Sequence, residues 1–157
     1  MGSEEKVIAY LTENGYGDRV RHFHNTDVTA GSTADALGVD TDRICKGLAF
    51  RGKNCPAIVV LASGNARVDN HKFKEAIGVR PTMISSDQCE ELIGHVAGTI
   101  NPFCLNEGVK LYLDMSILKH KGENVFPGIG DVDSVVELSI DELEKLTKPI
   151  CWVDVTK

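Results

Sequence analysis

The chain has 157 residues, of which 42% are hydrophobic, and a formal net charge of −6 at pH 7. This length and composition predict a single domain, residues 1–157, with a core of its own. They exclude a membrane span, which needs about 18 consecutive apolar residues, and they disfavour a protein that coats nucleic acid through bulk charge.

The first third of the chain predicts short helices and strands in turn. Residues 3–14 have apolar positions at helical spacing, and Gly15 is placed to end the helix. The elements expected next are a strand over 19–24, a helix over 29–37, a strand over 43–50 and a strand over 56–62. The last of these is almost wholly apolar and β-branched, so we expect it at the centre of a sheet.

The remaining two thirds give no repeated βα rhythm. The expected elements are a helix over 70–77, a brief strand over 81–84, a helix opened by a capping box at Ser85 and Gln88, strands over 109–115 and 134–138, a helix opened by a second capping box at Ser139 and Glu142, and an edge strand over 151–153. Strands irregularly interleaved with short helices predict an α+β fold with a mixed sheet.

Residues 94–103 interrupt this pattern with two glycines and an Asn-Pro pair between apolar residues. Gly98 permits close backbone approach, whereas Pro102 fixes its own φ and keeps Asn101 out of the helical region. We interpret the segment as a strand entering a rigid turn whose backbone amides face a small polar ligand. The alternative is a plain joint between a strand and a turn.

The cysteines and histidines do not predict a metal site or a disulfide framework. The five cysteines are scattered without a C-x-x-C pair, which fits reduced thiols in a cytoplasmic protein. His22 and His24 could place two imidazoles on one face of a strand, although exposed strand positions are the plainer interpretation. Cys104 has no histidine placed by the sequence to activate it, so a buried thiol is expected there. We expect no cofactor.

Six motifs follow one another along the chain: A-D-A-L-G-V at 34–39, the K-G-L of a strand at 46–48, G-H-V-A-G-T-I-N-P-F at 94–103, V-K-L-Y-L-D-M-S at 109–116, the turn F-P-G-I-G at 126–130 and V-E-L at 136–138. In this order they resemble the motifs of the YbaK and prolyl-tRNA-synthetase-associated editing domains. They span nearly the whole chain. The resemblance implies a barrel-like mixed sheet flanked by short helices.

The resemblance also implies an activity and its site. The activity is a free-standing deacylase that hydrolyses the ester of a wrong amino acid on tRNA, most often tRNA for proline, without a metal. Its partners would be the 3′ acceptor end of aminoacyl-tRNA and prolyl-tRNA synthetase. By position, Lys46 and Gly98 would be catalytic. Residues implied to bind substrate are His22, His24, Thr99, Ile100, Asn101, Pro102, Asp114, Ser116, Gly128 and Gly130.

Two departures from the family pattern leave other functions open. Lys46 is followed by Gly47 where the family has threonine or serine, and Cys104 stands where many members have glycine. These departures favour a non-catalytic module of the same fold that binds tRNA or a synthetase. A hydrolase of a small ester or thioester is a third interpretation.

Overall fold

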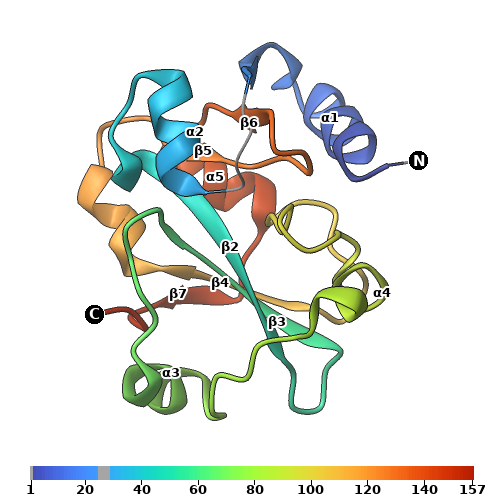
Figure 1. The fold of residues 1–157 in the computed structure, drawn as a ribbon, viewed down its shortest axis with the longest axis vertical. Coiled ribbons are helices and arrows are strands. Elements are labelled where there is room, and N and C mark those ends of the chain that lie inside the picture. Colours follow the sequence, from blue (N-terminus) through green and yellow to red (C-terminus); the bar gives the residue numbers. More distant parts are fainter. Residues whose placement is uncertain (1, 25–28) are drawn as a thin grey trace.

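A curled, five-stranded mixed sheet forms the centre of the computed structural model, which describes residues 2–24 and 29–157 (Figure 1). The strands lie in the order β5 (Phe126–Pro127), β2 (Ile44–Arg51), β3 (Ala57–Ser63), β4 (Lys110–Asp114) and β7 (Cys151–Val153). β2 and β3 are antiparallel, and the other neighbouring pairs are parallel. The predicted mixed α+β fold is therefore confirmed.

The middle strand, β3, is buried along its whole length. Every residue of β3 is buried, as expected for an apolar, β-branched strand covered on both faces. β7 closes one edge of the sheet, as the sequence predicted. A second, two-stranded antiparallel sheet pairs β1 (Val20–His22) with β6 (Ser134–Val136).

Short helices surround these sheets. They are α1 (Ser3–Glu13), α2 (Ala30–Leu37), α3 (Asn70–Ile77), α4 (Cys89–Ile93) and α5 (Ile140–Thr147), with 3₁₀ turns at Gly17–Arg19, Thr41–Arg43, Ser86–Gln88 and Met115–His120. The capping box at Ser139 is confirmed: its hydroxyl accepts from the Glu142 N–H, and Glu142 accepts from the Ser139 N–H. None of the helices in the described residues is long and apolar enough to cross a membrane.

Three local predictions were wrong. Ser85 caps no helix through its side chain; its hydroxyl donates to the Gln88 side chain, and a 3₁₀ turn precedes α4. Residues 81–84 form only an isolated bridge, Phe50 to Met83, because the chain touches the end of β2 and then leaves it. Residues 95–101 contain turns but no strand.

Helix α1 packs against the largest core cluster and reaches two loops. Val7 and Leu11 are fully buried in that cluster. The Lys6 ammonium donates to the Gly94 carbonyl at 2.6 Å, and Glu4 accepts a hydrogen bond from the Ser134 hydroxyl at 2.5 Å. These contacts tie α1 to the segments on both sides of the cavity described next.

Candidate active site

A cavity of about 280 Å³ opens between β2, the 98–100 turn and the loop that follows β5. Its lining residues in the described chain are Phe23, Thr29, Ala30, Thr33, Ile44, Cys45, Lys46, Gly47, Leu48, Gly98, Thr99, Ile100, Gly128, Gly130, Asp131, Val132, Ser134 and Val135. Four segments that are distant in sequence thus meet here, and they lie within residues 23–33, 44–48, 98–100 and 128–135. Lys46 and Gly98, which the sequence singled out, line the same cavity.

Lys46 is half-buried on β2, and neighbouring carbonyls hold its amine. Its Nζ donates to the carbonyl oxygen of Ala66 at 2.6 Å and to that of Gly64 at 3.2 Å. Burial lowers the pKa of the Lys46 amine, and the nearby Arg67 guanidinium lowers it further. The result is an oriented cation beside the cavity.

Gly47 brings strand β2 into contact with the 98–102 turn. A Cβ atom at position 47 would lie 2.5 Å from the Ile100 carbonyl oxygen and 2.8 Å from its carbonyl carbon, so only glycine fits this approach. The departure from the family pattern therefore has a local reason. Because Gly47 has no side chain, the 98–102 turn packs directly against the backbone of β2.

Buried polar side chains brace the turn internally. Asn101 donates through Nδ2 to the Thr99 carbonyl at 2.9 Å and accepts through Oδ1 from the Phe103 N–H at 3.0 Å. His95 is fully buried and its Nε2 lies 2.6 Å from the Phe103 carbonyl oxygen, which makes Nε2 the protonated nitrogen. Burial lowers the pKa of His95 and keeps the ring neutral.

Two backbone amides of the turn are available to a ligand. Gly98 has a φ of 86°, in the left-handed region that favours glycine. The Thr99 N–H is used within the turn, where it donates to the Val96 carbonyl at 3.0 Å. Neither the Gly98 nor the Ile100 N–H donates to another residue that the structure describes. Such unpaired amides at a cavity are suited to binding an anionic oxygen.

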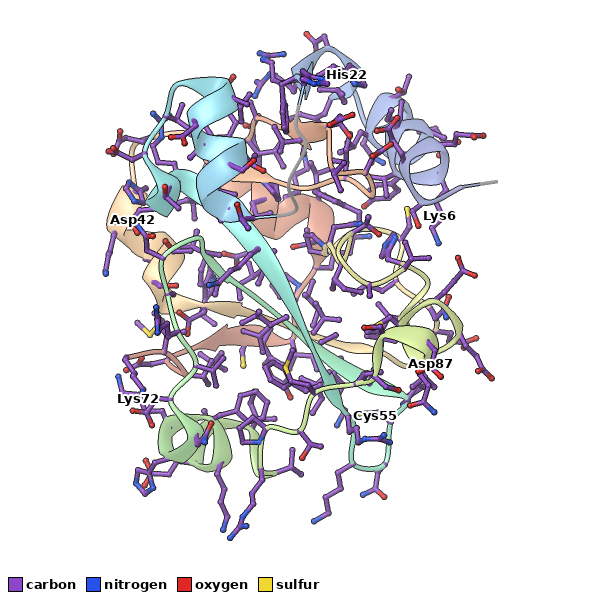
Figure 2. The ribbon with its side chains drawn as sticks, viewed as in Figure 1. Lys6, His22, Asp42, Cys55, Lys72 and Asp87 are labelled. Carbon is purple, nitrogen blue, oxygen red and sulfur yellow. The ribbon has the colours of Figure 1, made fainter. Side chains whose placement is uncertain are left out.

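Six of the ten remaining predicted site residues lie outside this cavity. Asn101 and Pro102 belong to the turn but are buried and do not line the cavity. His22 and His24 are exposed, and Phe23 between them lines the cavity instead; Figure 2 shows His22 at the periphery of the molecule. Thr99, Ile100, Gly128 and Gly130 do line it.

Asp114 and Ser116 belong to another part of the molecule. The buried Asp114 carboxylate accepts from the Val155 N–H, the Ser116 N–H and the Thr156 hydroxyl, and so it fastens β4 to the last residues. The Ser116 hydroxyl accepts from the Ser63 N–H at 3.1 Å and lines a second, separate cavity of about 310 Å³. Both residues therefore have structural partners.

Sequence analysis missed several cavity residues. Thr29 and Thr33 lie one helical turn apart, a spacing that could have indicated a shared face. Asp131 and Val132 follow the glycine-bearing turn and carry no pattern that sets their direction.

Cys104 adopts a backbone conformation in which glycine is favoured, with a φ of 52°. Burial raises the pKa of its thiol, which lies against the carbonyl of Lys6 at 3.6 Å. A thiol with a raised pKa is a weak nucleophile at neutral pH.

Burial also raises the pKa of Cys45, to about 12. In the described residues, no group of three His, Cys, Asp or Glu side chains could hold a metal ion.

The family model described as the aminoacyl-tRNA editing domain matches residues 24–146, and the chain belongs to this family. The chain is 32% identical over 155 residues to the uncharacterized protein YwhH of Bacillus subtilis (strain 168), covering 99% of this chain and 98% of that protein.

Two further relatives have names that refer to prolyl-tRNA synthetase or proline–tRNA ligase. A solved structure of a candidate trans-editing enzyme for prolyl tRNA synthetase superposes with a TM-score of 0.86 at 26% identity, covering 100% of this chain and 98% of the other. The proline–tRNA ligase of Streptococcus sanguinis (strain SK36) is 26% identical over 138 residues, which make up 74% of this chain and 22% of the ligase.

Proposed function

We propose that this protein is a free-standing trans-editing hydrolase, acting in the cytoplasm, that deacylates mischarged aminoacyl-tRNA. The substrate we propose is tRNA for proline that carries alanine, cysteine or another small amino acid. Support comes from the family membership, from the two relatives connected to proline, and above all from the meeting of Lys46 and the Gly98 turn at one cavity.

The residues suit ester hydrolysis without a protein nucleophile. An aminoacyl ester is already activated, so a water molecule, positioned with help from the terminal ribose hydroxyl, can add to the carbonyl carbon. The Gly98 and Ile100 N–H groups would stabilise the negative oxygen that develops, and the bond to the ribose oxygen then breaks. Lys46 would hold the terminal phosphate or ribose as a cation.

The test is a deacylation assay with Ala-tRNA and Cys-tRNA, both made on tRNA for proline. We expect the wild-type protein to release the amino acid and Lys46→Ala to lose roughly 100-fold or more in rate. Lys53→Ala is the matched control, because Lys53 is an exposed lysine in the β2–β3 connection. A wild-type protein inactive on both esters, or a fully active Lys46→Ala, would contradict the proposal.

A further inference from the structure

The cavity carries one positive and one negative side chain. Of its lining residues in the described chain, Lys46 and Asp131 are the two with a formal charge. Lys46 comes from β2, whereas Asp131 lies in the loop between β5 and β6. Much of the rest of the lining is apolar, with Phe23, Ile44 and Leu48 among its members. A ligand that satisfies this cavity therefore carries charges of both signs.

The Asp131 carboxylate is oriented but not neutralised. Its Oδ1 accepts from the Val132 N–H at 2.6 Å, which fixes the direction of the side chain. Its Oδ2 has no hydrogen-bond partner among the residues that the structure describes, and no cation pairs with it there. Asp131 is exposed and lines the cavity, so a bound ligand could reach it.

The loop that carries Asp131 is held in place from outside the cavity. Gly130 has a φ of 108°, and a Cβ atom there would lie 2.8 Å from the backbone of Ser3 and Glu4. Ser134 donates to the Glu4 carboxylate at 2.5 Å. The N-terminal helix therefore fixes both ends of the short segment that presents the carboxylate.

We infer that Asp131 binds the α-ammonium group of the aminoacyl ester. This inference rests on the proposed function. An aminoacyl group on the 3′ end has its positive charge within two bonds of the ester carbonyl, whereas the nearest negative charge is a phosphate. Lys46 and Asp131 together match that pattern of charge. The site would thus require a free α-amine and reject esters that lack one.

The test compares alanyl-tRNA with lactyl-tRNA, in which a hydroxyl replaces the ammonium at nearly equal size. Each enzymatic rate is divided by the spontaneous hydrolysis rate of the same ester, because the ammonium itself activates the ester. The wild-type protein should prefer the alanyl ester by roughly fivefold to thirtyfold, the range of one charge-assisted hydrogen bond. Asp131→Asn should lose that preference, because its alanyl rate should fall more than its lactyl rate. The variant keeps an oxygen for the Val132 N–H. Asp87→Asn, an exposed charge removal on the side of α4, is the matched control (Figure 2).

A binding arm separates this inference from the proposed function. The probes are 3′-alanylamido and 3′-lactylamido derivatives of 3′-amino-3′-deoxyadenosine, which resist hydrolysis. The inference is supported if the wild-type protein binds the alanyl probe more tightly than the lactyl probe and Asp131→Asn loses this difference. If that result is obtained but no ester is hydrolysed, the proposed function alone is overturned. Equal loss of both esters and both probes in Asp131→Asn, or no preference in the wild-type protein, overturns the inference. Binding of neither probe by the wild-type protein overturns both.

Discussion

Cys104 is a residue whose backbone and side chain have different preferences. Its φ of 52° suits glycine, yet its side chain packs partly against the largest core cluster. For a residue other than glycine, the left-handed conformation costs roughly 1–2 kcal/mol. Glycine, the residue that the family resemblance leads us to expect after Pro-Phe, would adopt this conformation without that cost.

We expect Cys104→Gly to change the free energy of unfolding by less than about 1 kcal/mol, because relief of backbone strain offsets the lost packing. Cys104→Val should destabilise the protein by about 1–2 kcal/mol, since a β-branched residue tolerates positive φ poorly. Urea unfolding measures both. Deacylase activity should persist in Cys104→Gly; its loss would contradict the structural role assigned to the thiol.

His95 gives the stability of the protein a pH dependence of known sign. Burial lowers its pKa, so below the ordinary histidine value of about 6.5 the unfolded chain binds more protons than the folded one. The contribution of His95 to the free energy of unfolding is therefore complete above a pH of about 6.5 and is lost as the pH falls. Wild-type stability should therefore fall from pH 7 to pH 5 relative to His95→Gln, by at most about 1.4 kcal/mol per pH unit. Denaturant unfolding of both proteins at each pH measures the difference, and parallel curves would contradict it.

At the scale of elements, the contact between β2 and the 98–102 turn decides the shape of the site. Gly47→Ser would restore the residue type of the family pattern but place its Cβ 2.5 Å from the Ile100 carbonyl oxygen. The turn must then move away from the strand. We expect deacylation to fall by roughly tenfold or more, since small displacements of positioning groups are costly.

The control for this substitution is Gly31→Ala on α2. A Cβ atom at Gly31 meets no other atom within 4 Å. Alanine in a helix is favoured over glycine by roughly 0.5–1 kcal/mol, so Gly31→Ala should be stable and active. Crystal structures or activity assays of Gly47→Ser that match the wild type would show that the turn adapts without cost.

The sequence predicted the helices and strands that local residue patterns determine. It did not predict which side chains of those elements reach the cavity. The buried strand β3 and the Ser139 capping box follow from residue type and spacing, and both are confirmed. β1 has three residues, too few for alternation to set which face turns inward, and so Phe23 rather than His22 or His24 reached the cavity. The roles of Lys46 and Gly98 stay predictions, and only the family resemblance led us to expect both residues in one site.

Two site residues show why the rest could not be predicted. The family resemblance placed Asp114 among the substrate-binding residues, but its partners Val155 and Thr156 come from the far end of the chain. Asp131 was missed because only the folded chain brings it to the Lys46 cavity. Contacts between residues so distant in sequence leave no trace in a local pattern.

For the whole molecule, α1 contributes to the largest core cluster, although the family model begins only at residue 24. Leu11 is fully buried in the largest cluster, so Leu11→Ala should destabilise the protein by about 2–5 kcal/mol. Ile8→Ala, at a half-buried position on the same helix, should cost distinctly less. Thermal or urea unfolding compares the two, and equal small effects would show that α1 does not hold the core.

The cavity has a consequence for synthesis of the protein on the ribosome. Its walls come from residues 44–48, 98–100 and 128–135, and contacts at such separations close late because loop-closure entropy opposes them. A nascent chain that has not yet exposed residue 128 has the lysine and the turn but lacks the wall that faces them. The complete cavity would then form only after residues 128–135 have left the ribosome.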